Sequence, residues 1–302
     1  MTDPQRVTIR ISGGVADVRL NRPEKLNALD HSMFEALVAA GERLAGERGV
    51  RAVVLSGEGR AFCAGLDFEA FAAMAEEARA GGAGEARAGG AGGERAGGAG
   101  GERAGRAGGE HAGGVRALGE RPPGRPANLG QQAAYTWTEL PVPVIAAVHG
   151  VALGGGLQIA LGADLRVVAP DAKLSVREIR WGLVPDMTGT QVLPRLVPLD
   201  VAKELTWTGR MVSGEEAAAM GLATRVATNP REAAMALAAD IAGRSPHAVR
   251  AAKRLLNQSG QVDLARQLLD ESKEIGALIG SPNQAEAVRA WFEKREPVFT
   301  DP

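Results

Sequence analysis

The sequence predicts a mixed α/β fold whose last third is largely helical. Two patterns predict this: short apolar strands alternate with loops and helices up to about residue 197, and the hydrophobic spacing becomes helical from Pro198 onward. A composition of 45% hydrophobic and 24% charged residues is typical of a globular protein. We therefore expect a core over residues 1–197 and a helical region over residues 198–302.

A hairpin is predicted at the N-terminus. Two runs in which apolar and polar side chains alternate flank a Gly-Gly turn, at residues 7–11 and 15–20. The stretch NRPEKLNALD then has the proline and asparagine of a loop. Its last residue, Asp30, is the predicted N-cap of a helix that continues to Leu44.

A short apolar strand at residues 51–55 precedes a second loop, SGEGRAFCAGLD. The order of strand, loop and helix favours an α/β or repeated β-β-α architecture. Residues 79–114, which follow, consist almost wholly of Gly, Ala, Arg and Glu and include three copies of an octamer of the type AGGERAGG. Because Ala is their largest apolar residue, they cannot bury a core.

We interpret this stretch as an insertion in a surface loop, bounded at about residues 76–126 and closed by RPPGRP. Its alternating Arg and Glu residues argue against a nucleic-acid-binding arm. Setting residues 79–114 aside leaves 266 residues, which is enough for a sizeable core.

Regular structure is predicted again from Asn128. A helix reaches Glu139, the apolar run 141–148 forms a buried strand, and a glycine turn and helix lead to another strand at residues 165–168. The C-terminal region is expected to contain six helical stretches, at residues 201–208, 214–220, 232–242, 246–257, 264–279 and 284–292.

Composition and charge exclude several classes of function. The net charge is −1, from 35 basic and 36 acidic residues, so we expect no nucleic-acid partner and no attraction to an anionic membrane. One cysteine excludes internal disulfides, and four histidines without ligand spacing make a catalytic metal site unexpected. A polar start and an apolar region interrupted by charges at 142–169 predict a cytoplasmic protein without a membrane span.

Two glycine-containing turns are the first candidates for a functional site. They lie in AFCAGLD, which contains Gly65, and in VALGGGLQIALG, whose triplet 154–156 begins a helix. Glycine lets a backbone amide approach a ligand, and the unpaired amides at a helix N-terminus favour negative charge on a substrate oxygen. A tight turn between strand and helix is the structural alternative. Neither GxGxxG nor a phosphate-binding loop is present.

The combination of these turns with other segments resembles the crotonase superfamily, the enoyl-CoA hydratase/isomerase group. The segments that carry the resemblance are NRPEKLNAL, AFCAGLD, VHGVALGGG, ADLRVVAPDAKLSVREIRWGLVPDMTGTQVLPRL and LTWTGRMVSGEEAAAMGLATRV. They cover nearly the whole chain outside the insertion. The resemblance implies a spiral of β-β-α repeats followed by an α-helical trimerisation region, and hence a homotrimer or a dimer of trimers.

The resemblance also implies an acyl-CoA thioester substrate whose carbonyl oxygen is bound by two backbone amides. By position these are the amides of Leu66 and Gly155. Two such donors stabilise an enolate oxygen, and loss of one typically costs on the order of 3 kcal/mol of activation energy. No cofactor is expected, because coenzyme A belongs to the substrate and the thioester itself accepts the electrons.

Three side chains match the positions at which the family places its chemistry, namely Gln158, Glu178 and Asp186. Hydratases of the family have glutamates at the positions of Gln158 and Glu178. Gln158 is neutral and can only donate or accept hydrogen bonds, which weakens a hydratase assignment and gives it a positioning role. Asp186 matches an aspartate of dienoyl-CoA isomerases, which also have an aspartate in place of Gln158.

We therefore expect an enzyme that moves a double bond of an enoyl- or dienoyl-CoA, with Glu178 as the principal base and Asp186 assisting. Addition of water to a 2-enoyl-CoA is the first alternative. A non-catalytic acyl-CoA-binding protein is an alternative of another class. Hydrolases and dehalogenases of the superfamily share the two amides. Structural alternatives also exist for the carboxylates: Glu178 could pair with Arg177 or Arg180, and Asp186 could cap a helix near Thr188.

Further residues on the same loops are predicted to contact the substrate. Arg22 and Lys25 are candidates for the coenzyme A phosphates, since two cations on a loop suit a multiply charged ligand. Asp67 and Asp164 are also expected to hold loop and strand ends, and Cys63 to be a packed residue. The complete set of predicted substrate contacts is Ala64, Asp67, Phe68, Arg22, Lys25 and Leu26.

Overall fold

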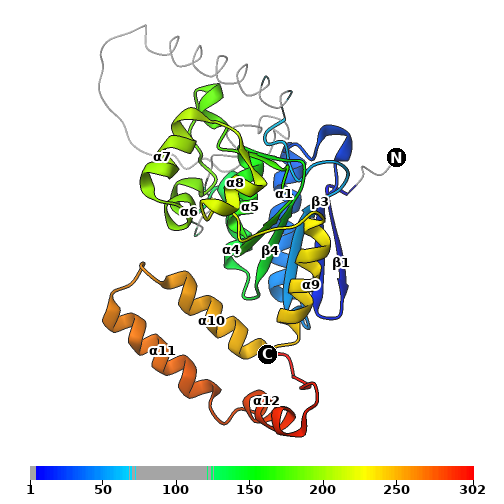
Figure 1. Ribbon diagram of the computed structural model, residues 1–302, viewed down its shortest axis with the longest axis vertical. Helices are drawn as coiled ribbons and strands as arrows, with labels where there is room; N and C mark the ends of the chain where they lie inside the picture. Colours follow the sequence, from blue (N-terminus) through cyan, green and yellow to red (C-terminus); the bar gives the residue numbers. More distant parts are fainter. Residues whose placement is uncertain (1–4, 68, 70–71, 73–120, 122–123, 125) are drawn as a thin grey trace, which may run out of the picture.

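The computed structural model describes residues 5–67, 69, 72, 121, 124 and 126–302 (Figure 1). The insertion expected at about residues 76–126 therefore lies almost wholly outside the described residues. The described chain forms an α/β body, and three C-terminal helices extend from one end of it.

A six-stranded sheet runs through the α/β body. Its strand order is β1-β2-β3-β4-β6-β9, and only the first pair is antiparallel. The hairpin expected at the N-terminus is present, with β1 and β2 joined at Gly13 and Gly14. The strands are β1 Val7–Ser12, β2 Val15–Leu20, β3 Ala52–Gly57, β4 Val144–Val148, β6 Leu165–Val168 and β9 Arg225–Val226.

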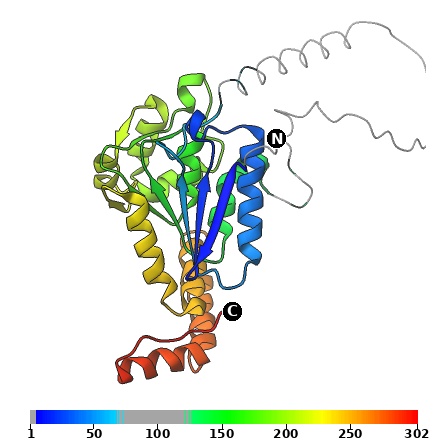
Figure 2. The ribbon, with the colours of Figure 1, turned by 90° about the vertical axis from the view of Figure 1, so that its right-hand side faces the viewer.

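Both faces of the sheet are buried, which explains the continuous apolar runs of its central strands. In β3, Val53 and Leu55 pack into a large cluster with α1 (His31–Gly46) and α4 (Leu129–Glu139). Val54 packs on the opposite face, in a smaller cluster that includes Ala234 and Ala238 of α9 (Pro230–Ala242). Figure 2 shows α9 and α1 on opposite sides of the strands.

Two of these helices begin as the sequence predicts. The side chain of Asp30 accepts a hydrogen bond from the amide of Met33 and so caps α1. Asn128 and Gln131 form a reciprocal capping box at the start of α4. The strand expected from residue 141 begins only at Val144, because a proline at residue 143 offers no amide hydrogen to a ladder.

A second, three-stranded sheet lies beside the first and was not predicted as a sheet. It has the order β5-β7-β8, with strands β5 Val151–Leu153, β7 Lys173–Ser175 and β8 Val212–Ser213. Such short strands give too little periodicity to be recognised in a sequence. The elements around it are η1 Pro23–Lys25, α5 Gly155–Gly162, η2 Glu178–Trp181, α6 Gly189–Leu196, α7 Leu199–Thr208 and α8 Gly214–Ala219.

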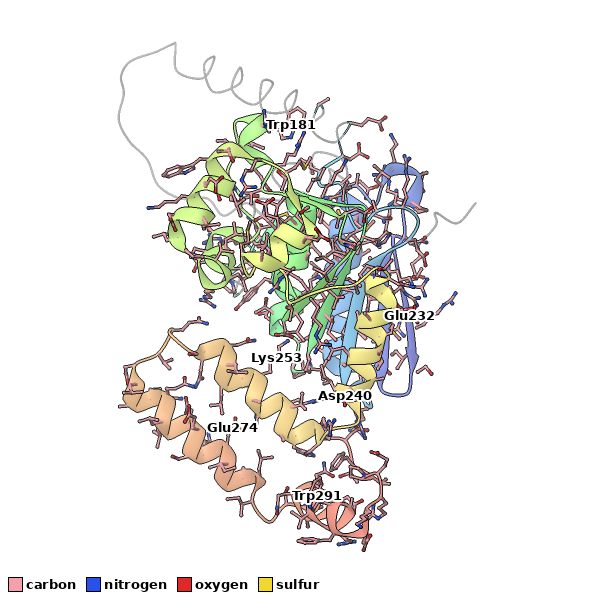
Figure 3. All side chains as sticks on the ribbon, viewed as in Figure 1. Trp181, Glu232, Asp240, Lys253, Glu274 and Trp291 are labelled. Carbon is pink, nitrogen blue, oxygen red and sulfur yellow. The ribbon has the colours of Figure 1, made fainter. Side chains whose placement is uncertain are left out.

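The C-terminal helices α10 (Pro246–Gln258), α11 (Leu264–Leu278) and α12 (Pro282–Glu293) lie below the α/β body in Figure 1. Lys253 connects α10 to the body, since its Nζ lies 2.7 Å from Asp164 Oδ2 and 3.0 Å from the Val142 carbonyl (Figure 3). By contrast, α11 has no buried residue. The boundary between core and helical region at residue 197 stays a prediction.

Candidate active site

Three loops leave the same edge of the main sheet. Strands β2, β3 and β4 are mutually parallel, so their carboxyl ends lie side by side. From these ends leave the loops that contain NRPEKLNALD, AFCAGLD and VALGGG. Ligands of open α/β sheets bind outside the carboxyl ends of the strands. The topology thus brings together the segments that sequence analysis singled out.

The two glycine turns are joined by a short parallel bridge. The Cys63 amide donates to the Val151 carbonyl at 3.0 Å, and the Leu153 amide donates to the Cys63 carbonyl at 3.1 Å. On its other side the segment pairs with the first loop, where the Leu29 amide donates to the Gly65 carbonyl at 2.8 Å. AFCAGLD is therefore held between the other two loops.

These pairings orient the amides of Leu66 and Gly155. The Gly65 carbonyl points at Leu29, and in a trans peptide the next amide hydrogen points the opposite way, toward the glycine triplet. The Gly154 carbonyl accepts from the Gln158 amide inside α5, so the Gly155 amide points out of the helix N-terminus. Within the described part of the chain, neither amide has a hydrogen-bond acceptor.

Glycine is required where the two turns approach each other. Gly65 has a φ of +89°, and a methyl group placed on it would lie 2.6 Å from the Leu153 carbonyl oxygen and 3.8 Å from the Gly155 nitrogen. That space admits no side chain. The two unpaired amides are consequently close together, as in an oxyanion hole.

The Glu178 side chain lies against the same turn. A methyl group on Gly154 would come within 3.3 Å of Glu178 Oε1, so the carboxylate faces the backbone that precedes the Gly155 amide. Glu178 is 8% exposed. Its Oε1 accepts a hydrogen bond of 2.6 Å from Gln158 Nε2, whereas its Oε2 is buried without a partner among the described residues. One carboxylate oxygen is thus fixed and the other is free to take a proton.

The orientation of Gln158 is fixed by its neighbours. Its Oε1 accepts from the amides of Met187 and Gly189 at 2.8 and 3.0 Å, so its nitrogen must be the atom that faces Glu178. Gln158 therefore donates to the glutamate and links it to the turn that follows Asp186. The sequence alone did not indicate these contacts, and the positioning role of Gln158 stays a prediction.

Burial raises the pKa of Glu178, and the charge of Asp186 raises it further. Loss of water around Asp186 also raises the pKa of that group, even though its side chain remains accessible to solvent. Raised pKa values favour groups that exchange protons near neutral pH.

The structural alternatives for the two carboxylates are not what the structure shows. Glu178 bonds to Gln158, and the ion pairs of the described residues include none between Glu178 and Arg177 or Arg180. Helix α6 has Thr188 as its N-cap residue and has no side-chain cap, so Asp186 does not cap it.

The Arg22 side chain forms an ion pair within the protein. Its Nη1 lies 2.6 Å from Asp67 Oδ2, and its side chain is only 11% exposed. We had expected Arg22 to bind a phosphate of coenzyme A. The contact with Asp67 leaves its side chain little freedom to do so. The side chain of Lys25 is 45% exposed and pairs with Glu69, so of the two cations it is the more accessible to a ligand.

The other predicted contacts lie on the same loops. Leu26 has left-handed backbone geometry, and its carbonyl accepts from the Ala64 amide at 3.0 Å. Phe68 lies outside the described residues. Contact of any of these residues with a substrate stays a prediction.

Asp164 and Cys63, for which we expected structural roles, have contacts inside the protein. Asp164 Oδ2 accepts from the Val144 amide at 2.7 Å in addition to pairing with Lys253. Cys63 is fully buried, and burial raises its pKa to about 12, so it is a packed thiol and not a nucleophile.

Sequence analysis did not recognise the role of Asn27. This residue is fully buried, and its side chain donates to the carbonyls of Glu58 and Ala61 and accepts from the Arg22 amide. It therefore joins the first loop to the second. The φ of +56° at Asn27 is a geometry that asparagine tolerates, which is the signal that the sequence offered.

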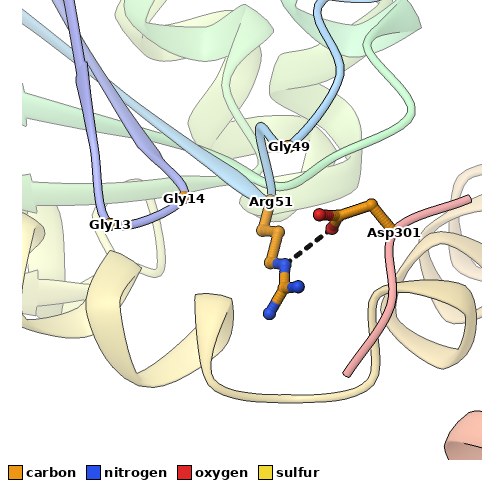
Figure 4. A pocket seen from close by; sticks show the side chains of 5 residues that line it. All are labelled: Gly13, Gly14, Gly49, Arg51 and Asp301. Carbon is orange, nitrogen blue, oxygen red and sulfur yellow. Dashed lines mark hydrogen bonds and ion pairs between the residues drawn. The ribbon is translucent and has the colours of Figure 1, made fainter. Parts of the chain in front are cut away.

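A hollow of about 270 Å³ lies at the opposite, amino-terminal edge of the sheet (Figure 4). It is lined by Gly13, Gly14, Gly49, Arg51 and Asp301 and contains no residue of the candidate site. Arg51 pairs with Asp301 there at 2.7 Å, so this hollow marks where the C-terminal tail is fastened.

Across the described ranges, no three His, Cys, Asp or Glu side chains gather closely enough to hold a metal ion. No helix in the same part of the chain has the length and apolar character that crossing a bilayer requires.

Comparison with known proteins agrees with this site. The model of the enoyl-CoA hydratase/isomerase family matches residues 10–86 and 112–302. A probable enoyl-CoA hydratase of Bacillus subtilis is 31% identical over 97% of this chain and 98% of its own. Mouse mitochondrial methylglutaconyl-CoA hydratase is 39% identical over 53% of each chain. The crystal structure of an enoyl-CoA hydratase from Bacillus anthracis superposes with a TM-score of 0.78, at 31% identity, over 98% of this chain and 99% of the other.

A mixed α/β body with glycine turns and a buried carboxylate beside two free amides is the architecture of a crotonase-type acyl-CoA enzyme. The chain belongs to the enoyl-CoA hydratase/isomerase family.

Proposed function

We propose that this enzyme shifts a double bond of an enoyl- or dienoyl-CoA through a thioester enolate. The observation that carries the proposal is the arrangement of Glu178, whose Oε1 is held by Gln158 while its Oε2 is buried and unpartnered beside the glycine turn. This arrangement supplies one positioned base next to two amides that stabilise an oxyanion.

In the proposed reaction, Glu178 takes a proton from the α-carbon of a 3-enoyl-CoA. The electron pair moves onto the thioester oxygen, which accepts hydrogen bonds from the amides of Leu66 and Gly155. The same proton, or one from solvent, is returned at the γ-carbon, and the double bond then lies between the α- and β-carbons. Asp186 assists by exchanging protons with the distal carbons of a longer conjugated system. The composition of the substrate does not change.

The contacts of Gln158 favour a double-bond shift over hydration. Its oxygen already accepts from two backbone amides, and one of its N–H groups donates to Glu178. Gln158 can therefore offer at most one N–H to a water molecule and cannot take its proton. A water molecule between residues 158 and 178 would have one carboxylate base where a hydratase has two.

Hydration of a 2-enoyl-CoA is the second candidate, favoured by the names of the relatives, in which hydratases dominate. In that case Glu178 would activate water alone or with Asp186. A non-catalytic acyl-CoA-binding protein is the third candidate, favoured by the replacement of a carboxylate by Gln158.

The purified protein in D2O, supplied separately with a 3-enoyl-, a 3,5-dienoyl- and a 2-enoyl-CoA, distinguishes the three by mass spectrometry and proton NMR. We expect a product with a shifted double bond and no added water. Gain of one water from the 2-enoyl ester would establish the hydratase instead. Binding without product or deuterium incorporation would support the non-catalytic protein.

Replacement of Glu178 by glutamine tests the role of the base. E178Q should lower the rate of double-bond shift at least about 100-fold, because a positioned general base contributes that much, while acyl-CoA binding stays close to that of the wild type. E139Q is the matched control, because Glu139 also accepts a 2.6 Å hydrogen bond from a glutamine, Gln132, but on α4. Full turnover in E178Q would overturn the assignment of the base.

We also propose that the chain assembles as a homotrimer or a dimer of trimers. The proposal is supported by family membership and by large apolar side chains of the C-terminal helices, such as Trp291 at 81% exposure (Figure 3). The cytoplasmic location expected from the sequence stays a prediction.

A further inference from the structure

A chain of ion pairs ends at Asp67, the residue that follows Leu66. It consists of four charged side chains of alternating sign that come from the N-terminal segment and the first two loops. In order they are Arg6, Asp30, Arg22 and Asp67.

Asp67, the residue after Leu66, is held by both carboxylate oxygens and by its backbone amide. Its Oδ2 lies 2.6 Å from Arg22 Nη1, its Oδ1 accepts from the Glu69 amide at 2.9 Å, and its own amide donates to the Leu29 carbonyl at 3.1 Å. The residue is 6% exposed. A hydrogen-bonded ion pair shielded from water is stronger and less mobile than one at the surface.

Arg22 contacts both of the loop segments whose pairing orients the Leu66 amide. Its Nη1 donates to the Ala28 carbonyl at 3.2 Å as well as to Asp67. Leu29 follows Ala28. Its carbonyl accepts a hydrogen bond from the Asp67 amide, and its amide donates one to the Gly65 carbonyl. The residues before and after Leu66 are therefore both hydrogen-bonded to Leu29. Arg22 therefore connects the Ala28 carbonyl of the first loop to the Asp67 side chain of the second.

The far end of the chain is equally fixed. Asp30 caps α1 by accepting from the Met33 amide, lies 3.5 Å from Arg22 Nε, and binds Arg6 at 2.8 Å. Two arginines face two aspartates, so the group carries no net charge of its own. A ligand phosphate at Arg22 would have to replace these contacts, which makes a structural use of this arginine the better explanation of its geometry.

We propose that Arg22 and Asp67 are positioning residues for the oxyanion hole, and that their ion pair holds the Leu66 amide in the orientation that polarises the thioester carbonyl. This inference rests on the proposed function, because it assigns a purpose to that hole. It differs from a role in binding coenzyme A, which would place Arg22 in contact with the ligand.

The measurement is the infrared C=O band of butyryl-CoA labelled with ¹³C at the thioester carbon. This ester has no double bond to move, so the band can be recorded without turnover. In the wild type, two amide donors should move the band to lower wavenumber on binding. D67N keeps the acceptor for the Glu69 amide and removes the charge, while R22K keeps the charge and removes the planar fork.

Both variants should lose a large part of the band shift while the Kd for butyryl-CoA changes less than about threefold. With a turned-over substrate, kcat should fall about 10- to 100-fold, the range that misplacement of a reacting group produces, with little change in KM. R22K should retain more of the band shift than D67N, since a lysine can still pair with Asp67.

D17N is the matched control. Asp17 is a buried aspartate, 7% exposed, that pairs with Arg19 and Arg231 on β2, away from the glycine turns. It should lose stability comparably and keep the wild-type band shift.

If D67N does not fold, R22K carries the test. A wild-type band shift retained in the folded variants would overturn the inference. Weaker binding with an unchanged band would instead assign Arg22 to the coenzyme A and equally overturn it. The absence of a band shift in the wild type itself would contradict the proposed hole.

Discussion

At the scale of single residues, the proposed proton transfer depends on the contact between Gln158 and Glu178. A carboxylate at position 158 would repel the like charge of Glu178, whereas the glutamine donates a hydrogen bond to it. The pKa of Glu178 is therefore raised by burial and by Asp186, without a second adjoining carboxylate. The sequence shows which residue types stand at these positions, whereas the amides of Met187 and Gly189, which donate to Gln158, are brought to it by folding alone.

The variant Q158E tests this charge relation. Its carboxylate can still accept from Met187 and Gly189 but can no longer donate to Glu178, so like-charge repulsion should raise the pKa of Glu178. The base is active when ionised, and the acid limb of the pH–rate profile should therefore move to higher pH. Steady-state rates between pH 4 and 9 measure the displacement, with Q132E, at the glutamine of the α4 pair, as the control. An unmoved limb would contradict the repulsion.

Glu178 also predicts a pH dependence of stability. Its pKa in the folded state is raised above the ordinary value of 4.5, mainly by burial, so folding favours the protonated form. The stabilisation from this group is fully present below about pH 4.5 and is lost as the pH rises through the folded pKa. E178Q should consequently unfold at a higher denaturant concentration than the wild type at pH 7. Chemical unfolding at pH 4 should show that advantage shrinking, and an equal advantage at both pH values would exclude ionisation as its cause.

At the scale of elements, the two glycine turns illustrate what the sequence predicts and what it leaves open. The motif around Gly65 and the triplet at 154–156 indicated two places where backbone amides are exposed. That the turns meet depends on the Cys63–Ala152 bridge and on the parallel order of β3 and β4. Such pairings join residues distant in sequence, and no local pattern encodes them.

Gly65→Ala should be more destabilising than an alanine at another left-handed glycine. Gly13 is the control, because it has a φ of +57° but no atom within 4 Å of an added methyl group. Left-handed geometry costs each alanine about 1 kcal/mol. G65A must in addition move the Leu153 carbonyl, and we expect a total loss on the order of 3 kcal/mol of unfolding free energy, together with lower activity. Urea unfolding compares the two, and equal losses would mean that the turns do not touch.

Most helices of the C-terminal region begin and end within two residues of the positions expected from periodicity, because amphipathic spacing and capping residues are local signals. The two-residue strands β8 and β9 were missed, because their existence depends on partners elsewhere in the chain. The Arg22–Asp67 contact was missed for the same reason, since 45 residues separate its members.

At the scale of the whole molecule, the C-terminal helices expose many large apolar side chains. Those on α11, α12 and the adjoining turns include Leu264, Leu268, Leu269, Ile275, Ile279, Trp291 and Phe292. Large apolar side chains exposed in this number favour an interaction surface. Their exposure is the feature of the described structure that best supports the proposed assembly.

A charge on this surface should weaken self-association. L268D places a carboxylate on α11 at a side chain that is 52% exposed, and I11D does the same on the edge strand β1 at one that is 40% exposed. We expect sedimentation equilibrium to show an oligomer for wild type and I11D, and smaller species for L268D. An oligomer unaffected by L268D would remove α11 from the proposed interface.

The proposed oxyanion hole consists of main-chain groups, whereas the proposed proton-transfer groups are side chains on separate elements. A codon change can therefore alter positions 158, 178 or 186 without altering the hole's two donors. In the proposed mechanism, polarisation of the thioester is therefore a property of the fold, whereas the fate of the enolate depends on three replaceable side chains. For protein engineering, this chain is a scaffold in which a different reaction could be selected by substitution at those positions alone, with the glycine turns left untouched.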